Sequence, residues 1–107
     1  MRDRRQKERI STDLKIIACS PSINPDSRIT DISTTGAFIS TNSPLPVDAK
    51  PAIHVHLPGD PEIIEINARV VWTKATSNAT AAGMGIHFTN IAPEHQEKLT
   101  AFIEQNT

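Results

Sequence analysis

The chain has 107 residues and a formal net charge of −1, with 11 lysines and arginines against 12 aspartates and glutamates. This length fits one domain, and the near-neutral charge excludes the broad basic surface of a duplex-DNA-binding protein, so we expect no DNA partner. The single cysteine excludes an internal disulfide, and the lack of an apolar run of about 20 residues excludes insertion of a helix into a membrane.

Residues 1–9 form a charged segment, which we call the arginine arm, ahead of the first apolar run. Its basic residues are Arg2, Arg4, Arg5, Lys7 and Arg9. The arm has no apolar periodicity, so we expect it to be mobile unless a partner orders it. It also lacks the apolar core of a secretory signal, which predicts a cytoplasmic protein. Arg5 and Arg9 are four residues apart, and their guanidinium forks match phosphates and guanine edges.

Six segments downstream of the arm have the composition and alternation of β-strands and are separated by turn residues. They cover residues 14–19, 28–31, 36–41, 53–57, 64–72 and 83–88. In the fifth segment, apolar residues recur at every second position from Ile64 to Trp72, so this face, Trp72 included, is predicted to line the core. In the sixth segment, Met84, Ile86 and Phe88 share one face and two glycines occupy the other.

The last segment changes from a strand pattern to a helix pattern. Leu99, Phe102 and Ile103 have helical spacing, and Pro93 and Glu94 suit the first turn of a helix. Short antiparallel strands followed by one helix predict a mainly β fold, either a barrel or a sandwich, with the helix covering an opening. We therefore expect one domain, with the arm over residues 1–9, the strands over 10–90 and the helix over 91–107.

A polar turn is predicted between the second and third strands, over the sequence Asp31-Ile32-Ser33-Thr34-Thr35-Gly36. The side chains of Asp31 and Ser33 can bond to nearby backbone, and Gly36 can take a positive φ or allow a ligand to approach closely. Such a turn can hold a polar ligand.

The pair Arg-x-x-x-Arg and Asp-x-Ser-x-x-Gly, in this order and with strands around it, resembles the signature of PilZ domains, bacterial receptors for cyclic di-GMP. The segment Gly-Met-Gly-Ile-His-Phe over residues 83–88 is also similar to the last strand of that family. The resemblance implies a six-stranded antiparallel β-barrel with a C-terminal α-helix, a ligand held between the arm and the turn, and no catalysis and no cofactor. It implies a cyclic di-GMP site made of Arg4, Arg5, Arg9, Asp31, Ser33 and Gly36.

The chemistry of cyclic di-GMP suits these residue types. The ligand has two anionic phosphodiesters and two guanines, so guanidinium groups can bind both its charge and its guanine O6/N7 edges. Asp31 is an acceptor that either bonds a guanine N–H or orients an arginine, and Ser33 offers a hydroxyl. The chain has four phenylalanines and tryptophans, most of them at core-facing positions, so stacking is predicted to fall mainly to arginine faces.

Two other functions are compatible with the sequence. The first is an adaptor with the same barrel that binds a protein and no nucleotide. The second is a small barrel that binds single-stranded nucleic acid through the arm, although the low aromatic content and near-zero charge disfavour it. For the cyclic di-GMP receptor we expect an unidentified downstream protein, and a monomer or homodimer.

No other motif indicates chemistry. His54 and His56 share one strand face, but the sequence places no third ligand beside them, so we interpret them as surface residues and expect no metal site. Cys19 lies in an apolar stretch and is interpreted as a small buried side chain. Because no nucleophile is aligned with a base, we expect no enzymatic activity.

Overall fold

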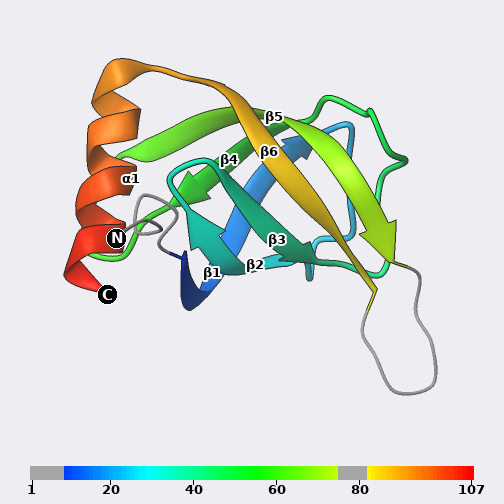
Figure 1. The fold of residues 1–107 in the computed structure, drawn as a ribbon, viewed down its shortest axis with the longest axis horizontal. Helices are drawn as coiled ribbons and strands as arrows, with labels where there is room; N and C mark the ends of the chain where they lie inside the picture. Colours follow the sequence, from blue (N-terminus) through cyan, green and yellow to red (C-terminus); the bar gives the residue numbers. More distant parts are fainter. Residues whose placement is uncertain (1–8, 75–81) are drawn as a thin grey trace, which may run out of the picture.

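The computed structural model describes residues 9–74 and 82–107. In these residues the chain forms a closed antiparallel barrel with the strand order β1-β2-β3-β6-β5-β4, and one helix lies at an end of the barrel (Figure 1). The elements are β1 (Arg9–Ser20), β2 (Arg28–Ser33), β3 (Gly36–Ser40), β4 (Ala52–His56), β5 (Ile63–Lys74), β6 (Gly83–Ile91) and α1 (Pro93–Gln105). The predicted fold class, a six-stranded antiparallel barrel with a C-terminal helix, is confirmed.

The core fills the inside of the barrel and extends beneath the helix. Inward positions of the strands carry branched aliphatic side chains, such as Ile39, Ile53 and Ile66, which are at most 1% exposed. Leu99 and Ile103 on α1 belong to the same buried cluster. Their spacing of four residues puts both on one face of the helix, and burying each contributes about 1.5–3 kcal/mol. In the part of the chain described, no helix is both long and apolar enough to span a membrane.

The first strand begins earlier than predicted. Backbone pairing with β2 starts at Arg9, which lies opposite Ser33, and Ile10 next to it is buried opposite Ile32. Only polar residues separate Ile10 from Leu14, so the sequence pattern did not reveal this part of the strand. Arg9 therefore belongs to the barrel wall, while residues 1–8 of the arm lie outside the described part of the chain.

Trp72 does not face the core, so that prediction is wrong. Val70 pairs with Ile86, but Trp72 pairs with Gly85, which leaves Val71 as an extra residue in β5. Such a β-bulge reverses the side-chain alternation that follows it. Trp72 consequently points outward and is 46% exposed.

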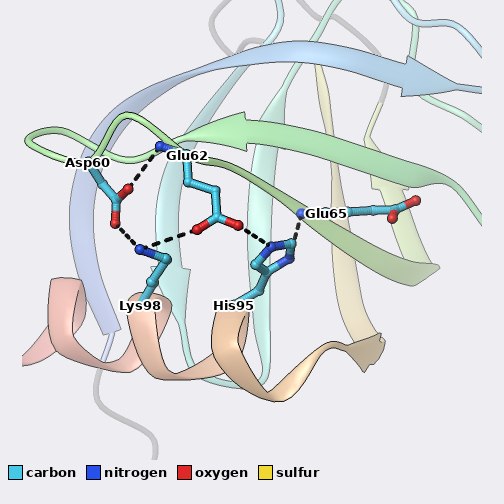
Figure 2. A network of polar contacts seen from close by, with 5 residues as sticks. All are labelled: Asp60, Glu62, Glu65, His95 and Lys98. Atoms are coloured by element: carbon cyan, nitrogen blue, oxygen red, sulfur yellow. Dashed lines mark hydrogen bonds and ion pairs between the residues drawn. The ribbon is translucent and has the colours of Figure 1, made fainter.

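A polar network, which we call the helix latch, ties α1 to the start of β5 and the turn before it (Figure 2). The Lys98 ammonium donates to Asp60 Oδ2 at 2.6 Å and lies 3.4 Å from Glu62 Oε1. The backbone N–H of Glu65 donates to His95 Nδ1 at 3.2 Å, so Nε2 carries the proton of the neutral ring and donates to Glu62 at 3.3 Å. The helix is thus held by side chains as well as by its buried face.

Candidate functional site

A groove of about 840 Å³ lies on the outer face of the barrel. Residues from five of the six strands line it, because neighbouring strands present their outward side chains to the same surface. The polar and aromatic side chains among them include those of Arg9, Asp31, Arg69, Trp72, Lys74 and His87. The groove is therefore positively charged overall and has an exposed ring in its wall.

Arg9 and Asp31 form an ion pair at one side of the groove. They lie on β1 and β2, and Arg9 Nε donates to Asp31 Oδ1 at 2.7 Å. Both side chains are partly exposed, at 47% and 40%. A guanidinium group has five N–H donors, so Arg9 can keep this bond and still donate to a ligand.

Ser33 is placed differently from Asp31. Its side chain is 2% exposed and does not line the groove. Ser33 Oγ accepts hydrogen bonds from the backbone N–H groups of Thr35 and Gly36, both at 3.2 Å. Ser33 thus shapes the turn from inside.

Gly36 lines the groove and is required by the packing of two strands. It lies opposite His87 on β6, where a Cβ atom would be 2.5 Å from the Ile86 carbonyl oxygen. In the described residues, the glycine with a positive φ is Gly59, so the close approach of β3 and β6 explains Gly36.

Two aromatic rings, Phe38 and Trp72, form what we call the aromatic platform on the groove surface. Their ring centroids are 5.4 Å apart with an angle of 24° between the planes. Phe38 and Trp72 both pair with Gly85, and a side chain at Gly85 or Gly83 would collide with these rings. The glycines of β6 therefore leave room for the rings to lie over the strand. The two-residue spacing of these glycines in the sequence could have indicated this role.

The platform adds an aromatic surface to the arginine faces on which stacking was predicted. Trp72 is 46% exposed, and Lys74 Nζ lies 5.8 Å from the centroid of the Phe38 ring. Base stacking on an aromatic side chain contributes about 1–3 kcal/mol per base. The groove can thus bind a planar ring as well as an anion.

Arg69 and His87 are further groove residues that the sequence did not single out. They face each other across β5 and β6, and His87 also pairs with Gly36 of the turn. Arg69 Nη1 donates to Asp48 Oδ1 at 2.8 Å. Because these contacts join residues far apart in the chain, no local motif marks them.

The family model of the PilZ domain matches residues 3–105. The chain belongs to the PilZ domain family. The resemblance detected in the sequence is therefore confirmed, and it covers the arm, the barrel and the helix.

This PilZ chain is also similar to the solved structure of the Bacillus subtilis inhibitor of motility MotI/DgrA, with a TM-score of 0.80 and 18% identity. The match covers 97% of this chain and 51% of that one, so the chain spans about half the length of its neighbour. At this identity the likeness shows the fold alone. No curated protein matches the chain.

The structure describes four of the six predicted site residues. Arg9, Asp31 and Gly36 line the groove together, and Ser33 supports the turn beneath it. Arg4 and Arg5 lie outside the described residues. The structure thus gathers three of the six predicted site residues in one groove.

The remaining candidate groups are on other surfaces. In residues 9–74 and 82–107, no group of three or more His, Cys, Asp or Glu side chains is placed to hold a metal ion. His54 Nε2 lies 3.7 Å from Glu65 Oε2 on the β4–β5 surface. Cys19 is half-buried, and this burial raises the pKa of its thiol, which disfavours the reactive thiolate.

Proposed function

We propose that this PilZ domain is a non-catalytic receptor that binds cyclic di-GMP in the groove and relays the signal to a protein partner. The observation that carries the proposal is that one groove holds Arg9 and Asp31 of the signature together with the exposed ring of Trp72. The Arg9 guanidinium suits an anion, the Asp31 carboxylate suits the N–H edge of a guanine, and the Trp72 ring suits the face of a base.

Each part of the ligand has a matching group. The guanidinium of Arg9 donates to a phosphodiester or to guanine O6 and N7, with about 1.5–3 kcal/mol for each charge-assisted bond. Asp31 holds Arg9 in place, and because a carboxylate has two oxygens it can also accept from a guanine N–H. A guanine base stacks on Trp72, whose ring rests against Phe38.

The arginine arm supplies the relay in this proposal. Arg4 and Arg5 donate to the phosphates, so that ligand binding fixes the arm beside the groove. Ordering a segment costs about 1–2 kcal/mol per residue, which the new charged bonds offset. The result is a changed surface at one rim of the barrel, where a partner protein can dock or be displaced.

Titration calorimetry with cyclic di-GMP tests the proposal, with cyclic di-AMP as the matched control. We expect saturable heat with cyclic di-GMP and binding at least about tenfold weaker for cyclic di-AMP, since adenine lacks the O6 acceptor for the arginine fork. The chain has one tryptophan, so its fluorescence reports directly from the groove. No heat and no fluorescence change at millimolar ligand would overturn the receptor function and favour the protein-binding adaptor.

The aromatic platform also gives a specific reason to test single-stranded nucleic acid. Stacked rings beside cations are typical of surfaces that bind unpaired bases. The net charge of −1 opposes this function, because binding to the backbone depends on many phosphate contacts. The test is a competition for the groove between cyclic di-GMP and an equal concentration of a mixed-sequence DNA oligonucleotide, followed by Trp72 fluorescence. We expect cyclic di-GMP to occupy the groove.

A further inference from the structure

Arg69 lines the groove on β5, apart from the signature residues on β1, β2 and β3. Its side chain is 42% exposed, and its guanidinium donates through Nη1 to Asp48 Oδ1 at 2.8 Å. This arrangement repeats the pairing of Arg9 with Asp31, in which the donor is Nε and the distance is 2.7 Å. The groove therefore contains two arginines, each held by one carboxylate.

Asp48 is fixed by its backbone. Its N–H donates to the Val70 carbonyl at 2.8 Å, and the Val70 N–H donates to the Ala49 carbonyl at 2.9 Å, so this loop is bonded to β5 beside Arg69. Asp48 has a φ of 76°, a left-handed conformation that few residues other than Gly, Asn and Asp adopt readily. Aspartate tolerates this conformation, and the backbone bonds to β5 hold it beside Arg69.

The two arginines come from different strands of the groove wall, Arg9 from β1 and Arg69 from β5. Along the groove side of the closed barrel, β2, β3 and β6 lie between these two strands. A ligand with two equivalent ends can therefore contact both side chains.

We infer that Arg69 is a second ligand-binding arginine, which takes the half of the cyclic dinucleotide that Arg9 and Asp31 do not contact. Asp48 is its positioning residue. The inference rests on the proposed function and deepens it, because cyclic di-GMP has two guanines and two phosphodiesters related by a two-fold axis. Each half of the ligand then contacts one arginine, and a carboxylate orients that arginine through a hydrogen bond.

Calorimetric titration with cyclic di-GMP tests this inference on the full chain. We expect Arg69→Ala to weaken binding about tenfold, the loss of one charge-assisted contact. Arg69→Lys should retain part of the affinity, because it keeps the charge without the fork. Asp48→Asn should weaken binding by a smaller factor of about three, since asparagine keeps the left-handed backbone but loses the carboxylate.

A matched control exists on the same barrel. Arg28 and Asp13 form a surface pair at 3.2 Å with exposures of 46% and 70%, close to the 42% and 75% of Arg69 and Asp48, but neither lines the groove. We expect Arg28→Ala to leave affinity unchanged. All these variants should melt within about 2 °C of the wild type, as is usual for exposed pairs.

Two further measurements separate binding from a structural effect. The Nε–H NMR resonance of Arg69 should shift on addition of cyclic di-GMP, while that of Arg28 should not. The factors by which Arg9→Ala and Arg69→Ala reduce affinity should multiply in the double variant, because the two groups contact different halves of the ligand.

The outcomes are distinguishable. In one outcome, the wild type binds, Arg9→Ala weakens binding, and Arg69→Ala behaves like Arg28→Ala. The claim that Arg69 binds the ligand is then wrong, while the proposed receptor function stands. Double-variant losses that do not multiply would overturn the assignment of separate halves. If Asp48→Asn binds as well as or better than the wild type, its positioning role is overturned. If the wild type does not bind, the receptor and this inference fall together.

Discussion

Arg9 Nε donates to Asp31 Oδ1 at 2.7 Å, and this bond connects β1 to β2 at the edge of the groove. The sequence allowed two roles for Asp31, as an acceptor for guanine or as a carboxylate that orients an arginine. The second role is present in the structure. The guanidinium of Arg9 is thereby directed before a ligand arrives, and such preorganisation reduces the entropy lost on binding.

The first prediction concerns this pair. Arg9→Ala should weaken cyclic di-GMP binding at least about tenfold, through the loss of charge-assisted bonds of about 1.5–3 kcal/mol. Asp31→Ala should weaken it less, and the double variant should lose less than the product of the two factors because the residues act as a unit. Calorimetry of the three variants gives the coupling directly. Independent, fully multiplicative losses would contradict the idea that Asp31 acts through Arg9.

The second prediction uses a glycine to displace Trp72. A Cβ atom at Gly85 would collide with the indole, and since Trp72 is 46% exposed its ring can swing away without loss of the barrel. Gly85→Ala should therefore weaken ligand binding by about fivefold or more, within the range for one stacked base. The control is Gly85→Ala in a Trp72→Ala background, where we expect no further loss. A further loss of affinity in that background would show that Gly85→Ala weakens binding without acting through Trp72.

The third prediction concerns Ser33, whose hydroxyl accepts two backbone N–H groups inside the turn. Ser33→Ala leaves the buried N–H of Gly36 and the part-buried N–H of Thr35 without this acceptor, so the free energy of unfolding should fall by about 1–3 kcal/mol. Urea denaturation measures this fall, and Ser11→Ala at an exposed position of β1 is the control. We expect the effect of Ser33→Ala on ligand affinity to be smaller than that of Asp31→Ala. A variant as stable as the wild type would contradict the structural role.

The fourth prediction concerns the helix latch and pH. The hydrogen bond from Lys98 lowers the pKa of Asp60 below its ordinary value of 3.8, and the same bond raises the pKa of Lys98 above 10.5. A lowered carboxyl pKa adds stability above the unfolded value, and this stability is lost as pH falls through the folded value. A raised lysine pKa adds stability that is lost as pH rises through the folded value.

Melting temperatures of the wild type and Lys98→Gln across pH check this. The wild type should melt higher between about pH 4 and pH 10, and the difference should disappear at the acidic end once Asp60 is protonated. A constant difference down to the lowest pH at which the chain folds would mean that the latch does not depend on the Asp60 charge.

The fifth prediction concerns the arginine arm. Cyclic di-GMP should protect the bonds after Arg4 and Arg5 from trypsin, because its phosphates draw both guanidinium groups to the groove. The bond after Lys98 in α1 should change little and serves as the internal control. Equal cleavage of the arm with and without saturating ligand would leave it outside the mechanism.

Local patterns predicted most of the architecture. The six strands and the helix follow from alternation, turn residues and the spacing of Leu99, Phe102 and Ile103. The start of β1 was missed because Ile10 is followed by three polar residues. A two-residue periodicity is reliable only where apolar side chains occupy the inward positions without interruption.

The site was harder to predict because it depends on register. Trp72 reaches the groove through one extra residue in β5, and a bulge of that kind has no sequence signature of its own. Arg69 meets Asp48 across 21 residues of sequence, through a loop that bonds to β5. The signature residues could be recognised, but the neighbours that complete their groove could not.

The closure of the barrel limits how a protein partner can attach. Throughout residues 9–74 and 82–107, every strand has a hydrogen-bonded neighbour on each side, so the barrel has no edge strand. The barrel therefore offers a partner no edge strand to pair with, although pairing with an edge strand is a common way in which extended peptides bind β proteins. We expect recognition to use side chains and loops, whose chemistry a bound nucleotide can change while the hydrogen bonds of the barrel remain as they are.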